Sequence, residues 1–111
     1  MEKFVKGDIV VVPFPFSDLS QAKKRPALVL SAPFGNDLIL CQITSRSIAD
    51  QYAVPLDESD YESGSLRHKS NIRPSRIFTA DTSIILYKAA HLKKSKIDQV
   101  LDSVVNILRS L

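Results

Sequence analysis

Arginine and hydroxyl side chains of this sequence are suited to work on a phosphodiester. Arg25 opens one apolar run and Thr44 ends the next, so a hairpin of the two runs would place both at the same end. Arg73 lies in the segment 63–79, which carries four basic residues and no acid. A guanidinium beside a hydroxyl can bind a phosphodiester and stabilise charge that develops on phosphorus. From spacing alone, an arginine at a sheet edge and a threonine in a cross-strand pair are an equally good interpretation.

Metal binding and thiol catalysis find little support in the sequence. The histidines His68 and His91 and the cysteine Cys41 show no HxxxH, CxxC or HExxH spacing, and glycine is too scarce for a phosphate-binding loop. Cys41 lies in an apolar run, which predicts a buried, unreactive thiol. His68 is suited either to phosphate binding or to a plain surface position, and His91 is placed in a turn with no role. We therefore expect no metal and no cofactor.

Short strands and one helix are the elements that must position these residues. Apolar and β-branched runs predict strands over 8–14, 26–31, 38–44, 52–56 and 84–87. Pro13 and Pro15 are expected to end the first strand, because proline cannot donate to a β-ladder. The turn sequence 33–37 joins the second and third strands into a hairpin, and Pro55 favours an edge position for the fourth.

The C-terminal segment has a different period. Apolar residues at 97, 100, 101, 104, 105 and 108 follow helical spacing, and Ser95 is the expected N-cap. The lysines at 93, 94 and 96 oppose the helix dipole, so they do not stabilise the helix. Contact with a partner or with nucleic acid is one explanation for them, and solubility is the favoured one. Many short strands and one terminal helix predict a mainly β fold, a small antiparallel barrel with a C-terminal helix.

Length and composition limit the classes of protein to which this chain can belong. The 111 residues are 44% hydrophobic and 24% charged, which predicts one globular domain over 1–111. A single cysteine excludes an intramolecular disulfide, and no segment has the apolar length of a membrane span or a signal region. We therefore expect a soluble cytoplasmic protein that does not bind membranes. The formal charge of +3 permits nucleic-acid binding without requiring it.

Several blocks of the sequence resemble one known family. They are GDIVVVPFPFSDL at 7–19, KRPALVLS at 24–31, QITS at 42–45, IR at 72–73 and FTAD at 78–81. These blocks resemble the MazF/PemK family of endoribonuclease toxins from type II toxin–antitoxin systems. The resemblance implies an SH3-like barrel, a homodimer, a cognate antitoxin protein and a single-stranded RNA substrate. It also implies sequence-specific, metal-independent cleavage by the 2′-hydroxyl, which leaves a 2′,3′-cyclic phosphate and a 5′-hydroxyl and inhibits translation and growth.

The resemblance also assigns site residues. Arg25 and Thr44 match the family's catalytic arginine and hydroxyl, and Arg73 matches an arginine that one branch uses. Nearby basic and polar residues are the expected RNA contacts: Lys23, Lys24, Ser45, Arg46 and His68. In the branch with the second arginine, an aspartate two residues later acts as the base. Ser75 stands there in this chain, so the proton acceptor stays open.

Two other functions remain open at this stage. One is a non-catalytic toxin of the same barrel fold that acts on DNA gyrase, as CcdB proteins do. The other is a nucleic-acid-binding barrel that has lost its activity. The arginine–threonine pair favours the ribonuclease, because a toxin that only binds a protein has no need of a phosphodiester site. The presence of both Arg25 and Thr44 also argues against a barrel that has lost its activity.

Overall fold

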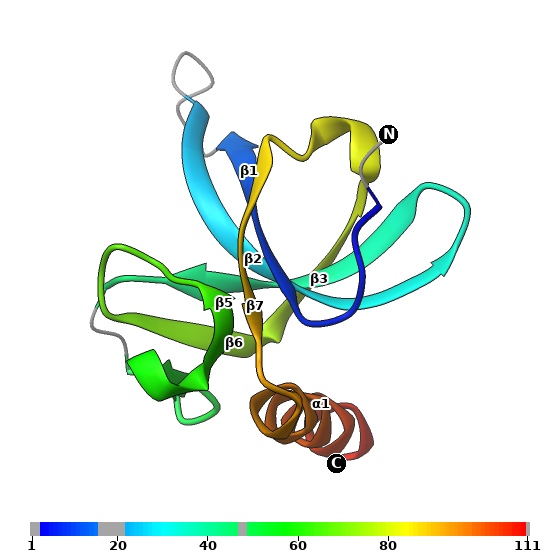
Figure 1. Ribbon diagram of the computed structural model, residues 1–111. Coiled ribbons are helices and arrows are strands. Elements are labelled where there is room, and N and C mark those ends of the chain that lie inside the picture. The colour runs from blue at the N-terminus through cyan, green and yellow to red at the C-terminus, as the bar shows by residue number, and fades with distance from the viewer. Residues whose placement is uncertain (1–2, 16–21, 47–48, 111) are drawn as a thin grey trace.

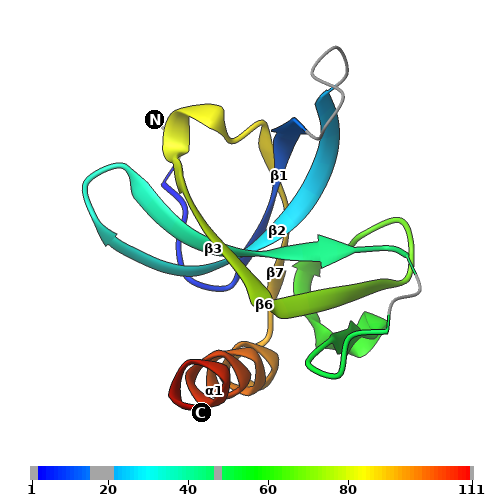
Figure 2. The ribbon, with the colours of Figure 1, turned by 180° about the vertical axis from the view of Figure 1, so that it is seen from behind.

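One curled antiparallel sheet and a C-terminal helix make up the computed structural model, which describes residues 3–15, 22–46 and 49–110 (Figures 1 and 2). Within these ranges the strand order is β4-β6-β3-β2-β1-β7-β5. The strands are β1 Asp8–Pro15, β2 Ala22–Phe34, β3 Asp37–Thr44, β4 Val54–Leu56, β5 Tyr61–Gly64, β6 Ser70–Asp81 and β7 Tyr87–Leu92. The helices are α1 Lys94–Arg109 and two short 3₁₀ turns, η1 Glu58–Asp60 and η2 Thr82–Ile84. The predicted class, a mainly β barrel-like fold with a C-terminal helix, is confirmed.

The β2–β3 hairpin is confirmed and is longer than predicted. Phe34 pairs with Asp37 across a two-residue turn, and Gly35 in that turn has φ +63°. The tip of the hairpin projects away from β5 and η1 in both views (Figures 1 and 2). The other end of the hairpin carries Arg25 and Thr44, the predicted reactive pair.

β1 covers the predicted range 8–14 and ends one residue later, at Pro15, the second of the two prolines expected to end it. β1 continues through Pro13, which pairs with Lys24, to Pro15. On its other side β1 pairs with β7 only over Asp8–Val11. Beyond Val11 no β7 residue pairs with β1, so this side of β1 is a sheet edge. A proline there lacks a backbone N–H without loss of a hydrogen bond to a neighbouring strand.

The strand predicted over 84–87 is wrong. Ile84 ends η2, and the Asp81 carboxylate accepts a hydrogen bond from the Ser83 backbone N–H at 2.8 Å at its start. β7 begins only at Tyr87 and runs through His91. His91 thus lies in a strand and not in a turn, and its Nδ1 is 2.8 Å from Oδ1 of the buried Asp8.

Two strands have no counterpart in the predictions, β5 and β6. β6 pairs with β3 in two stretches of different register, in which Cys41 faces Ile77 but Gln42 faces Arg73. Residues 74–76 therefore form a bulge on β6. The fourth predicted strand is shorter than expected, but β4 lies at the sheet edge beside β6, as Pro55 indicates.

Side chains of the sheet alternate between two hydrophobic clusters. Ile9 and Leu28 belong to the cluster that also contains Ile97, Val100 and Val104 of α1. Their neighbours in β1 and β2 belong to the second cluster, together with Leu38 and Leu40 of β3. The period of two along each strand fills both clusters.

The N-cap of α1 lies two residues earlier in the chain than predicted. Lys93 is the N-cap and makes no side-chain capping bond, so Ser95 lies inside α1 and its prediction as the cap is wrong. Lys94 Nζ is 2.9 Å from Asp98 Oδ2. Lys96 Nζ lies 3.4 Å from Asp60 Oδ2 and 3.3 Å from the Pro55 carbonyl oxygen. Lys96 thus ties α1 to the β4–η1 segment, which solubility alone does not explain.

Candidate active site

A small cavity at the open end of the β2–β3 hairpin collects the predicted reactive residues. Its volume is about 240 Å³. The lining consists of Phe14, Arg25, Gln42, Ile43, Thr44, Arg46, Arg73 and Arg76. Arg25, Thr44 and Arg73 are thus brought together, although they come from three strands. Arg46, expected as an RNA contact, lies beside them.

Strand register explains this convergence. Arg25 lies in β2 opposite Val12 of β1, and Thr44 is the last residue of β3. The bulge at 74–76 places Arg73 opposite Gln42, two residues from Thr44. Bulges re-aim side chains next to functional sites. Arg76 was not predicted as a site residue, and it reaches the cavity from this bulge, which the sequence pattern did not reveal.

The Thr44 hydroxyl is oriented by the chain that follows it. Its Oγ1 accepts a hydrogen bond from the Arg46 backbone N–H at 3.1 Å. A threonine hydroxyl has one O–H donor besides its lone pairs. The donor is therefore available to a phosphate oxygen in the cavity, where the arginines supply positive charge.

A carboxylate that the sequence did not point to borders this site. Asp50 Oδ2 lies 3.0 Å from Arg73 Nε, and Asp50 Oδ1 accepts the Tyr52 backbone N–H at 2.9 Å. The Tyr52 N–H and the guanidinium groups of Arg73 and Arg76 hold the pKa of Asp50 below its usual range, against the opposing effect of burial. Asp50 precedes Arg73 by 23 residues, so no sequence spacing signals the pair.

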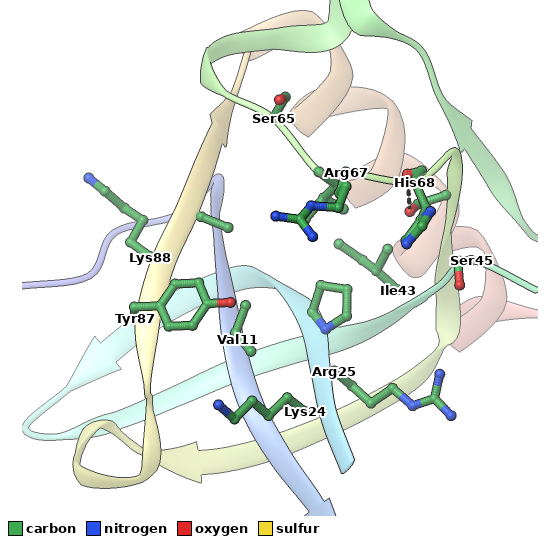
Figure 3. Close-up of a pocket in the computed structure, with 14 residues that line it drawn as sticks. Val11, Lys24, Arg25, Ile43, Ser45, Ser65, Arg67, His68, Tyr87 and Lys88 are labelled. Atoms are coloured by element: carbon green, nitrogen blue, oxygen red, sulfur yellow. Dashed lines mark hydrogen bonds between the residues drawn. The ribbon is translucent and has the colours of Figure 1, made fainter.

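A second, larger cavity adjoins the first and shares Arg25 with it. Its volume is about 700 Å³, within the range of sites that bind small organic ligands. Four of the predicted residues line it: Lys24, Arg25, Ser45 and His68. The lining residues that were missed include Arg67, Tyr87 and Lys88. Arg67 and Tyr87 point towards each other across the cavity, whereas the Lys88 ammonium points away (Figure 3).

Tyr87 was missed because its strand was placed three residues too early. Arg67 was visible in the acid-free segment but had no partner to single it out. Lys23 is exposed and lies outside the lining of both cavities, so its predicted contact with RNA stays a prediction. Cys41 is fully buried in β3, and burial raises the pKa of its thiol to about 12. Its predicted burial is confirmed.

No metal-binding cluster is found in the described ranges. Among these residues, no three His, Cys, Asp or Glu side chains lie close enough together to hold an ion. What the site offers instead is guanidinium charge and a hydroxyl donor. Such a site can bind a phosphodiester and stabilise added negative charge on it.

A curled antiparallel sheet with a terminal helix defines a small barrel-like protein, and its arginine-lined cavity has the charge needed to bind an anion. The chain belongs to the PemK-like, MazF-like toxins of type II toxin–antitoxin systems, whose family model matches residues 5–108. No curated protein matches the sequence.

Solved structures share the fold at low sequence identity. MazF from Deinococcus radiodurans superposes with a TM-score of 0.77 at 20% identity, over 99% of this chain and 100% of that one. A mycobacterial endoribonuclease in complex with its cognate antitoxin gives 0.76 at 11% identity, over 96% and 95%. The Mycobacterium tuberculosis toxin MazF-mt6 gives 0.68 at 18% identity, over 91% and 95%. In the described part of the chain, no helix combines the length and apolarity needed to cross a membrane.

Proposed function

We propose that this toxin is an endoribonuclease that cleaves single-stranded RNA at specific sequences without a metal ion, and thereby inhibits translation and growth. The observation that carries the proposal is the placement of Arg25, Thr44 and Arg73 around one cavity. Membership of the PemK-like, MazF-like toxins supports it. A toxin that acts by binding gyrase does not require these three side chains to converge, because it binds no phosphodiester.

The proposed reaction is an internal transesterification. The RNA 2′-hydroxyl attacks the adjacent phosphorus, and the bond from phosphorus to the 5′-oxygen of the next nucleotide breaks. The 2′-hydroxyl loses its proton and the leaving 5′-oxygen gains one. The products are a 2′,3′-cyclic phosphate and a 5′-hydroxyl. A guanidinium keeps its proton at neutral pH, so Arg25 and Arg73 act by stabilising the charged phosphorane, and Thr44 donates to one of its oxygens.

The nucleotides beside the cut are proposed to occupy the larger cavity. Arg25 borders both cavities, so a phosphate at Arg25 leaves the neighbouring nucleotide next to Lys24, Ser45 and His68. The Tyr87 ring is suited to stack on a base, as aromatic side chains do in proteins that bind single strands. Sequence preference would then depend on this cavity.

An antitoxin protein and a second copy of the chain are the proposed partners. One structural relative is an endoribonuclease bound to its cognate antitoxin, and another is a MazE–MazF complex from Deinococcus radiodurans. For this chain we propose the same class of partner, and a homodimer as the acting form. The RNA substrate makes the cytoplasm its proposed place of action, and we propose that the 111 residues act as one domain.

End-mapping of a cleaved RNA tests the proposal. The purified protein in EDTA is expected to cut a mixed-sequence RNA at a few sites. Each 3′ fragment should accept label from polynucleotide kinase without prior phosphatase, because it begins with a 5′-hydroxyl. A 2′-deoxy nucleotide before the cut should abolish cleavage and leave binding largely intact. A requirement for Mg²⁺, or 5′-phosphate ends, would refute the mechanism, and inhibition of gyrase with intact RNA would support the alternative toxin.

A further inference from the structure

We propose that Asp50 is a positioning residue that holds the Arg73 guanidinium in the catalytic cavity. This inference rests on the proposed ribonuclease function and goes beyond it, because Asp50 belongs to none of the segments that carry the family resemblance. The juxtaposition itself is direct: Arg73 Nε lies 3.0 Å from Asp50 Oδ2.

The Asp50 carboxylate is itself held in place. Its side chain is only 8% exposed, and its other oxygen accepts the Tyr52 N–H at 2.9 Å. This bond closes a local turn between residues 50 and 52, so the carboxylate has little freedom to rotate. The Arg73 side chain is 21% exposed, and this contact restricts the rotamers that it would otherwise sample.

The geometry of the bond leaves Arg73 able to act. A guanidinium carries five N–H donors, and the contact with Asp50 uses the one on Nε. The donors on the two terminal nitrogens are outside this bond. Planar guanidinium groups that are fixed through one edge lose less freedom when they bind a phosphate through another.

Charge supplies a second reason for the carboxylate. Arg25, Arg46, Arg73 and Arg76 line one cavity of about 240 Å³, and like charges so close repel one another. An ionised carboxylate at Arg73 offsets this repulsion before the RNA arrives. Because its neighbours hold its pKa low, Asp50 stays ionised at neutral pH. Both of its oxygens are already engaged, which fits a positioning residue better than a proton acceptor.

Asp50→Asn is the test variant, because asparagine keeps an oxygen for the Tyr52 N–H and loses the charge. We expect kcat for RNA cleavage to fall about tenfold while KM changes less than twofold. Glu58→Gln is the matched control: it removes one negative charge from the exposed η1 turn, outside the catalytic cavity, and should leave kcat unchanged. In an Arg73→Ala background, Asp50→Asn should lower kcat by less than a further factor of two.

A readout without activity accompanies the kinetics. In the wild-type protein the Arg73 Nε–H signal in ¹⁵N NMR should exchange slowly with water, and in Asp50→Asn it should exchange at least tenfold faster. Unchanged kcat in Asp50→Asn, an equal loss in the presence and absence of Arg73, or unchanged exchange would each overturn the inference. Failure of the proposed function looks different, because the wild-type protein itself would then leave every RNA intact.

Discussion

Arg25 is the charged residue that lines both cavities, which also share Ile43. It lines the small cavity with Thr44 and Arg73, and it lines the larger cavity with Lys24 and His68. In the proposed reaction, Arg25 contacts the scissile phosphate and lies between it and the neighbouring nucleotide in the larger cavity. Its loss should therefore strongly impair the chemical step.

Replacement of Arg25 by alanine is expected to lower kcat by about a hundredfold or more, since one lost donor to a charged transition state costs about 3 kcal/mol. Thr44→Ala should be similarly impaired, and Arg73→Ala less. Lys6→Ala is the control, because Lys6 is exposed and lies outside both cavities. Single-turnover cleavage measures the effect, and circular dichroism checks the fold. An Arg25→Ala variant with wild-type kcat would contradict the proposed role.

Cys41 is expected to resist alkylation in the folded protein. Burial raises its pKa from 9.0 to about 12, which lowers the thiolate population about a thousandfold at a given pH below 9. Iodoacetamide at pH 8 should label the unfolded chain quickly and the native chain very slowly. Reactivity of the native protein should still be rising with pH above 9, where that of the unfolded chain levels off. Equal labelling rates in both states would show that the thiol is accessible.

At the scale of the elements, apolar periodicity predicted the hairpin and the helix, because both bury one face against a core. It could not predict β6, whose register depends on a bulge, or the start of β7, where Asp81 caps a 3₁₀ turn after an apolar run. Arg25 and Thr44 were placed together because they end adjacent strands of one hairpin. Asp50 was not found, because its pairing with Arg73 spans 23 residues and depends on the fold.

Gly7 joins three elements just before β1. Its N–H donates to the Val29 carbonyl at 2.9 Å, and its carbonyl accepts from the Leu92 N–H at 3.0 Å. It has φ +96°, and a Cβ here would run into Cδ1 of Ile97 in α1. Backbone strain and overpacking both oppose a side chain at this position.

Gly7→Ala should therefore lower the free energy of unfolding by about 3 kcal/mol, as measured by urea denaturation. Gly35→Ala is the control. Gly35 also has a positive φ, +63°, but a Cβ there meets open space. That variant should lose only about 1 kcal/mol. Equal losses for the two variants would show that the contact with Ile97 costs nothing.

At the scale of the whole molecule, apolar surface lies on the helix face that points away from the sheet. Leu108 is 71% exposed and Val105 46%, whereas Val104 packs into the core. An apolar surface of this kind is typical of contacts between subunits. It supports the proposed homodimer, in which α1 supplies part of the interface.

Light scattering at tens of micromolar should give the mass of a dimer, twice 12.3 kDa. Leu108→Glu places a charge in the proposed interface and should shift the protein towards the monomer. Asp37→Lys, an exposed change of charge at the hairpin tip, is the control and should not. A monomeric wild-type protein at this concentration would count against the dimer.

The bulge on β6 also sets which side of the sheet each of its residues faces. Ile72 belongs to the cluster with α1, whereas Phe78 and Ala80 pack with the other cluster. Both lie an even number of positions after Ile72 in the sequence. In an unbroken strand they would share one face, so the odd length of the 74–76 insertion reverses the parity of the strand. Evolution can therefore lengthen or shorten this segment only in steps of two. Deleting Ser75 alone would turn Phe78 and Ala80 out of their cluster, whereas deleting Ser75 together with Arg76 would preserve both clusters.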